Sequence, residues 1–158
     1  MPLTIRAERP EFRLGTLGPL VVVVWYTEPT VAALDVLEAT HRELFAVHGK
    51  LTLLSVILRA GNSPAPEVRA KIDAQTSSLS AMRLGSVVVV LIKGLASIFV
   101  RTYLAAVSLT SPEVMKIVKS VDEAAVEIRG LPGQHDALRT ANALGADLAA
   151  FVALPAPS

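Results

Sequence analysis

The clearest feature of the hydrophobic pattern is an unbroken apolar run at residues 86–94, SVVVVLIKG, in which most residues are β-branched. A strand with one wet face alternates apolar and polar residues, whereas a continuous apolar run is typical of a strand covered on both faces. Gly85 precedes the run, and Lys93 and Gly94 close it. The pattern therefore predicts the central strand of a sheet that is covered by helices.

Four shorter segments predict the remaining strands. Residues 11–14 and 20–26 flank a turn at 15–18, which has glycine at both ends. Residues 51–58, LTLLSVIL, are again apolar on both faces, and residues 114–118 predict a short last strand. Together with the central run, these segments predict a sheet of four to five strands.

Apolar residues at helical spacing occupy most of the chain between these strands. A first helix is expected from Thr30, a good N-cap residue, to about His48. A second helix is expected from Ser63 or Pro64 to about Leu84, because proline is favoured at a first helical position. Strands that alternate with helices in this way are typical of an α/β domain.

The second half of the chain predicts three further helices. Residues 95–109, LASIFVRTYLAAVSL, are apolar around most of a helix, so this helix is either deeply sandwiched or lies at an interface. Ser120 followed by Glu123 is a capping box, which predicts a helix at residues 121–129. Residues 134–152 predict a final amphipathic helix that packs on its own domain or on a second copy.

These elements predict one α/β domain with short additions at each end. We expect a flexible N-terminal arm at residues 1–10, the α/β domain at 11–129, the extra C-terminal helix at 134–152 and a tail at 153–158.

The composition is unusually apolar for a chain of 158 residues. Hydrophobic residues make up 52% and charged residues 18%, against a usual charged fraction of about a quarter. Either the core is covered on both sides, or part of the surface meets a partner. We expect both, with a homodimer formed through the third helix or the C-terminal helix.

Charge and cysteine content exclude several classes of function. The net charge is +1 and the basic residues are scattered, so no nucleic-acid partner is expected. The absence of cysteine excludes a thiolate metal site and a thiol nucleophile. The most apolar window, residues 86–109, contains Lys93 and Arg101, so no membrane span is expected. The first ten residues lack the apolar core of a secretory signal, and we expect a cytoplasmic protein.

No catalytic or cofactor motif occurs in the sequence. The chain has no G-x-S-x-G, no G-x-G-x-x-G and no P-loop, so we expect no enzyme activity and no cofactor. His41 and His48 are two helical turns apart, about 10 Å, which is too far for both to bind one metal ion, so no metal site is expected. The pair His135-Asp136 follows a linker and predicts a helix start.

The order strand, strand, helix, strand, helix, strand, helix, strand, helix resembles the STAS domain, the fold of anti-sigma-factor antagonists and of the cytoplasmic domains of sulfate transporters. Two local features support the resemblance: the VVVVW strand before the first helix and the closing segment KIVKSVDEAAVEI. The resemblance covers residues 11–129. It implies a mixed, mostly parallel sheet covered by helices, and a regulatory protein-interaction module.

Antagonist members of that family typically carry an Asp-Ser pair where the third strand meets the second helix, and a kinase phosphorylates the serine. Here Asn62 and Ser63 occupy the corresponding place, followed by Pro64. A phosphate on Ser63 would lie at a helix N-terminus, which is favourable. An ordinary N-cap role explains the same serine.

In open α/β sheets, ligand and partner sites lie beyond the carboxyl ends of the strands. Those ends carry Glu28, Asn62, Ser63 and Lys93, which we take as the candidate partner- or ligand-binding residues. Lys93 is the one group among them that can meet an anion, although the simpler interpretation, which we favour, is a lysine that ends a strand in water.

Two functions follow as hypotheses. The first is a non-catalytic, cytoplasmic regulatory module of STAS type that binds an unidentified protein partner. The alternative is a protein that binds or senses a small apolar ligand, such as a lipid, in a pocket beside the central strand, lined by the apolar third helix.

Overall fold

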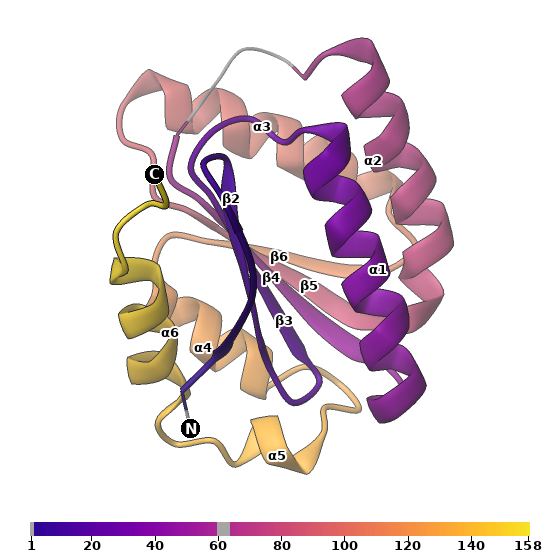
Figure 1. Ribbon diagram of the computed structural model, residues 1–158, viewed down its shortest axis with the longest axis vertical. Helices are drawn as coiled ribbons and strands as arrows, with labels where there is room; N and C mark the ends of the chain where they lie inside the picture. Colours follow the sequence, from indigo (N-terminus) through magenta and orange to yellow (C-terminus); the bar gives the residue numbers. More distant parts are fainter. Residues whose placement is uncertain (1, 60–63) are drawn as a thin grey trace.

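A mixed sheet of six strands forms the middle layer of the protein (Figure 1), as described by a computed structural model of residues 2–59 and 64–158. The strands follow one another across the sheet in chain order. The first three are antiparallel, and the last four run parallel to one another. The strands are β1 (Thr4–Arg9), β2 (Phe12–Leu17), β3 (Leu20–Trp25), β4 (Leu51–Ile57), β5 (Arg83–Val90) and β6 (Val114–Val118).

Helices cover both faces of this sheet (Figure 1). They are α1 (Val31–His48), α2 (Pro66–Leu79), α3 (Leu95–Thr110), α4 (Val121–Arg129), α5 (Asp136–Arg139) and α6 (Leu144–Ala153), with a short 3₁₀ turn η1 (Ser80–Met82) after α2. From β3 to β6 each crossover moves in the same direction, so right-handed connections place α1, α2 and α3 on one face. The other face is covered by the helices after β6.

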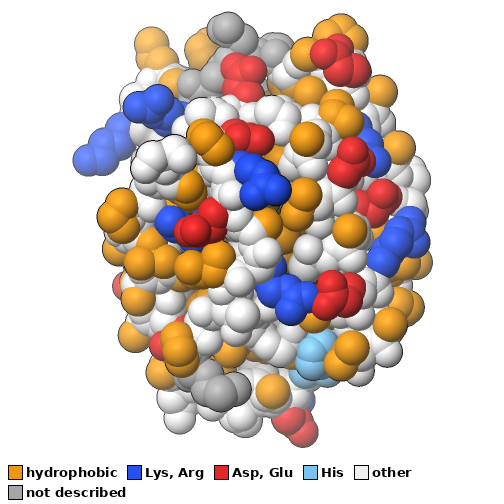
Figure 2. Space-filling model, in the orientation of Figure 1, with side chains coloured by type: hydrophobic (Ala, Val, Ile, Leu, Met, Phe, Trp, Pro, Cys, Tyr) orange, Lys and Arg blue, Asp and Glu red, His pale blue; other side chains and the backbone are white. Residues whose placement is uncertain are grey.

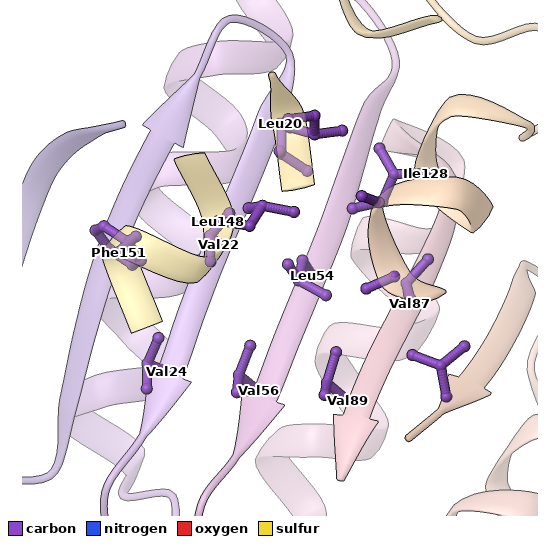
Figure 3. Close-up of a cluster of buried hydrophobic side chains, with 14 of the residues drawn as sticks. Leu20, Val22, Val24, Leu54, Val56, Val87, Val89, Ile128, Leu148 and Phe151 are labelled. Carbon is purple, nitrogen blue, oxygen red and sulfur yellow. The ribbon is translucent and has the colours of Figure 1, made fainter. Parts of the chain in front are cut away.

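The face under α4, α5 and α6, here called the α6 face, carries a closely packed core (Figure 3). Alternate strand residues point toward these helices because successive side chains of a strand lie on opposite sides. The core includes Leu20, Val22, Val24, Leu54, Val56, Val87, Val89, Ile128, Leu148 and Phe151. The C-terminal helix therefore packs on its own domain.

The face under α1, α2 and α3, here called the α3 face, carries a second core that is centred on α1. Phe12, Val23 and Trp25 of the sheet pack against Leu34 and Leu37. This core is concentrated at β2, β3 and β4, whereas α3 lies over β5 and β6 at the other side of the sheet.

Several elements lie where the sequence predicts them. The Thr30 hydroxyl accepts a hydrogen bond from the Ala33 amide and caps α1, which ends at Gly49 with a φ of 75°. Strand β6 has the expected bounds, and the Ser120 side chain accepts a hydrogen bond from the Glu123 amide at the start of α4. Each of these signals involves residues that are close together in the chain, so it can be recognised from the sequence.

The N-terminal segment differs from the expectation of a flexible arm, because Thr4–Arg9 forms β1. This strand brings the sheet to six strands, where four to five were expected. Its side chains are mostly exposed and largely polar, and its pairing with β2 is irregular between Ile5 and Ala7. Such a polar, bulged edge strand is stabilised by backbone pairing and leaves almost no hydrophobic signal.

The bounds and position of two other strands also differ. Strand β2 continues through Gly15 to Leu17, and the turn falls at Gly18, where φ is 54°. Strand β5 lies second from one edge, so the prediction that it is the central strand is wrong. Its apolar run arises because helices cover both of its faces, which does not require a central position.

The C-terminal region differs in detail from one continuous helix at residues 134–152. It forms the short α5, a turn and then α6. The first residues after α6 are hydrogen-bonded to strand β2. The Arg13 guanidinium donates hydrogen bonds to the Leu154 carbonyl (Nη1, 3.3 Å) and to the Pro155 carbonyl (Nη2, 2.7 Å). Among the described residues, no helix is long and apolar enough to span a membrane.

Candidate functional site

A cavity of about 360 Å³ lies on the α3 face, between the sheet and α1, α2 and α3. Helix α3 contributes one wall with five side chains: Phe99, Val100, Tyr103, Leu104 and Val107. The sheet contributes the opposite wall, which includes Trp25, Leu53, Ile57, Val88 and Met115. Both walls are mostly apolar.

The cavity exists because α3 stands away from the sheet. None of the α3 side chains is buried, although the helix is apolar around most of its circumference. Beneath it the strands carry Ser55 and Ser86, which are smaller than the Val and Leu side chains that point to the α6 face. Two small side chains in otherwise apolar strands leave space that the helix does not fill.

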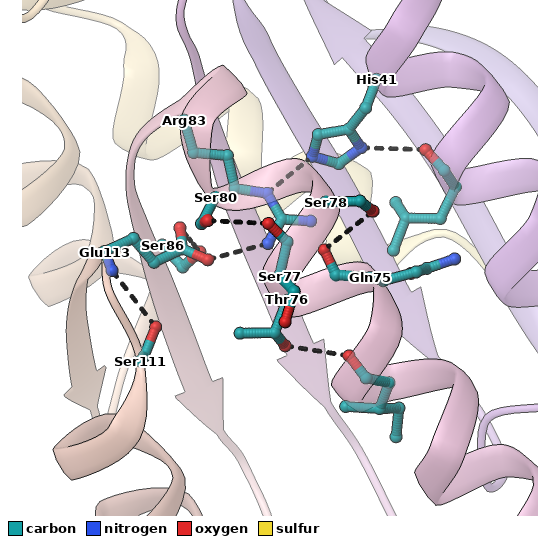
Figure 4. A network of polar contacts seen from close by, with 12 residues as sticks. His41, Gln75, Thr76, Ser77, Ser78, Ser80, Arg83, Ser86, Ser111 and Glu113 are labelled. Carbon is teal, nitrogen blue, oxygen red and sulfur yellow. Dashed lines mark hydrogen bonds and ion pairs between the residues drawn. The ribbon is translucent and has the colours of Figure 1, made fainter.

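One end of the cavity carries a buried polar cluster (Figure 4). The Arg83 guanidinium donates through Nη1 to Glu113 Oε1 (2.9 Å) and through Nε to His41 Nε2 (3.0 Å). The Ser86 hydroxyl donates to Glu113 Oε2 (2.8 Å). The Arg83 and Glu113 side chains are only 7% and 3% exposed, so this ion pair is almost entirely removed from water.

An irregularity in β5 brings the members of this cluster together. The pairing of β4 with β5 shifts register between Leu51, opposite Arg83, and Thr52, opposite Gly85. In a regular strand, residues three apart such as Arg83 and Ser86 would point to opposite faces. The register shift changes the direction of the Arg83 side chain, so that Arg83 and Ser86 both reach Glu113. Such irregularities commonly reorient a side chain in this way.

Burial and the neighbouring Arg83 lower the pKa of His41 from 6.5 to about 3, so its imidazole is neutral at physiological pH. Because Arg83 donates to Nε2, the His41 proton is on Nδ1, which donates to the Leu37 carbonyl (2.9 Å). Burial also lowers the pKa of Arg83, and the Glu113 carboxylate opposes that effect. A guanidinium nevertheless keeps its charge in proteins, so Arg83 and Glu113 form a true ion pair.

The far end of the cavity is lined by charged groups of both signs. Glu28, Arg59 and Arg69 contribute to it, and the Arg69 guanidinium lies over the Tyr103 ring, 5.9 Å from its centroid. Basic and acidic side chains are also interspersed on the face of the molecule in Figure 2, with no single-sign patch.

The residues singled out in the sequence have different locations. Glu28 lines the cavity, and Lys93 is exposed after β5 and is not part of the lining. Asn62 and Ser63 lie outside the described residues, and so does the phosphorylation site predicted at Ser63. Within residues 2–59 and 64–158, no three His, Asp or Glu side chains are grouped so that they could hold a metal ion.

The alternative hypothesis from the sequence placed a ligand pocket beside the third helix, but sequence reasoning did not identify the polar cluster. Arg83 was expected near the end of a helix, and Glu113, thirty residues later, had no visible partner. The signal that points to the site is the presence of Ser55 and Ser86 within runs of Val and Leu. Comparisons of the chain with family models, with curated proteins and with solved structures find no match.

Proposed function

We propose that this protein binds a small, predominantly apolar molecule in the cavity under α3, as a carrier or sensor without catalytic activity. The observation that carries the proposal is the cavity itself, whose walls are mostly apolar and which has a buried polar cluster at one end. Its volume of about 360 Å³ lies at the small end of the range typical of ligand pockets.

Two features of the site support binding over catalysis. Arg83 and Glu113 are occupied by each other, and His41 is fully buried behind Arg83 with its Nε2 used as an acceptor. A general acid or base must reach the substrate within hydrogen-bond distance. His41 does not line the cavity, so this histidine is not placed for proton transfer there.

The single tryptophan of the chain provides a direct test, because Trp25 lines the cavity. Titration with 2-octanone or 1-octanol is expected to change Trp25 fluorescence with saturation at one molecule per chain. Native mass spectrometry after gentle purification is an independent readout for a co-purified ligand. The absence of saturable binding together with a bare polypeptide mass would overturn the proposal.

A pair of matched serine substitutions localises the binding. Ser55→Leu places a large side chain in the cavity, and we expect it to abolish the fluorescence response while the protein stays folded. Ser77→Leu makes the same chemical change at an exposed position of α2 outside the cavity, and we expect unchanged binding. Equal responses from both variants would contradict a site under α3.

A second candidate function is a protein-interaction module, as the STAS resemblance implies. It is favoured by the exposed apolar side chains on α3, since Leu95, Phe99 and Leu109 are 75%, 74% and 87% exposed. Exposed apolar surface of this kind is typical of a contact with a partner. The C-terminal helix is not available for contact with a partner, because its residues Leu144 and Leu148 are buried within the chain.

Light scattering at high micromolar concentration tests the interaction module as a homodimer. The full chain is expected to be a dimer, and the double variant Leu95→Ser, Leu109→Ser a monomer with unchanged circular dichroism. A strictly monomeric full chain would count heavily against a homodimer through α3.

A further inference from the structure

The polar end of the cavity contains a hydrogen-bond donor that has no partner among the residues that the structure describes. Arg83 uses Nε for His41 and Nη1 for Glu113, and its Nη2 makes no hydrogen bond to any residue in the described ranges 2–59 and 64–158. Figure 4 shows this nitrogen on the side of the guanidinium away from Glu113. Arg83 lines the cavity under α3 and also a second hollow that includes Lys50 and Pro112.

This nitrogen is accessible although its side chain is almost fully buried. In the described part of the chain, every side-chain nitrogen or oxygen that is sealed from solvent has a hydrogen-bond partner. Because Nη2 has none, part of its surface is accessible to solvent, while the Arg83 side chain as a whole is 7% exposed. A charged donor held rigidly by two other hydrogen bonds is well suited to orient a ligand.

The charges of the cluster determine which kind of hydrogen-bond acceptor on a ligand can bind to Nη2. The Glu113 carboxylate compensates the Arg83 charge at a distance of 2.9 Å, so the cluster carries no excess positive charge. An anion at Nη2 would lose its hydration and would also be repelled by Glu113. An uncharged oxygen loses less on desolvation and still gains a charge-assisted hydrogen bond.

We propose that the ligand is an uncharged, mainly apolar molecule with a carbonyl or hydroxyl oxygen at one end, and that this oxygen accepts a hydrogen bond from Arg83 Nη2. The apolar body of the ligand lies between the sheet and α3, along Val88 and Leu104. This inference rests on the proposed function, since it specifies the ligand class and the orientation within the same cavity.

Probes of equal chain length test the inference on the unmodified protein. Trp25 fluorescence titrations compare 2-octanone and 1-octanol with octanoate at pH 8, where the carboxylate is ionised. We expect the two neutral probes to bind at least about ten-fold more tightly than octanoate. Octanoate binding as tight as or tighter than 2-octanone would overturn the inference and leave the proposed function standing, whereas no saturable binding by any probe would overturn both.

A conservative substitution tests the role of Arg83 itself. Arg83→Lys keeps the positive charge opposite Glu113 and removes the guanidinium Nη2, so we expect about ten-fold weaker binding of 2-octanone. Arg42→Lys makes the same chemical change at an exposed position of α1 outside the cavity, and we expect no loss. Equal affinity of the Arg83→Lys variant and the unmodified chain would overturn the assignment. If that variant does not fold, the comparison of neutral and anionic probes decides.

Discussion

Two apolar helices of this chain, α3 and α6, cover opposite faces of one sheet with different results. In α6, Leu144, Leu148 and Phe151 are at most 4% exposed and complete a closely packed core. In α3 no side chain is buried, and a cavity lies beneath it. Helix hydrophobicity does not explain the difference, because both helices are strongly apolar.

The strands beneath the two helices explain why one face is filled and the other hollow. Toward α6 the parallel strands present Leu and Val at successive positions, whereas toward α3 they present Ser55 and Ser86. Gly15 also lets the Phe151 ring approach the sheet backbone closely. The comparison indicates that the α6 face is closely packed, while the α3 face contains unfilled space.

The largest expected effect comes from shortening one leucine on each face. Leu148→Ala removes a fully buried side chain from the α6 core and should lower the free energy of unfolding by about 2–5 kcal/mol. Leu104→Ala removes a partly buried side chain beside an existing cavity and should cost about 1 kcal/mol or less. Urea denaturation followed by circular dichroism measures both, and equal losses would refute the contrast between the faces.

A smaller effect is expected from adding a methyl group at Gly15. The Cβ of Gly15→Ala would lie 2.6 Å from the Phe151 ring, which should destabilise the protein by about 1–3 kcal/mol. The double variant Gly15→Ala, Phe151→Leu should lose less than the sum of its two single variants, because the smaller side chain relieves the clash.

Gly145→Ala within α6 is the matched control for that prediction. Its added Cβ would lie 3.5 Å from Asp122 Oδ1, an ordinary contact, and alanine is favoured over glycine in helices by up to about 1 kcal/mol. Unchanged or higher unfolding free energy is expected, measured by the same denaturation. If Gly15→Ala also leaves the free energy of unfolding unchanged or higher, Phe151 does not pack tightly on β2.

The last test uses the pH dependence of the α3 face. The pKa of His41 is about 3 in the folded state, against an ordinary value of 6.5, so below pH 6.5 the unfolded chain binds more protons than the folded one. Stability should therefore fall as pH drops from about 6.5 toward 3, by up to about 1.4 kcal/mol per pH unit from this group. His41→Gln should show a shallower decline in denaturation at pH 7, 6 and 5, and an equal slope would contradict the buried neutral histidine.

Sequence reasoning succeeded where a feature depends on neighbours in the chain. The Thr30 cap, the glycine stop after α1 and the capping box at Ser120 are signals within four residues of the element that they define. It failed for β1, because an edge strand is defined by its pairing with β2 and not by its own hydrophobicity. It also missed the contact of Arg83 with Glu113, since nothing in the spacing of these residues indicates that they meet.

The sequence by itself determined an α/β domain, most of its helices and parallel strands, and the absence of recognisable catalytic motifs. The tertiary structure decided that α6 packs on its own sheet, that α3 stands away from it, and that a buried ion pair lies at one end of the resulting cavity. The physical reason is that elements form from short-range preferences, whereas filled or empty space depends on the volumes of side chains that only the fold brings together.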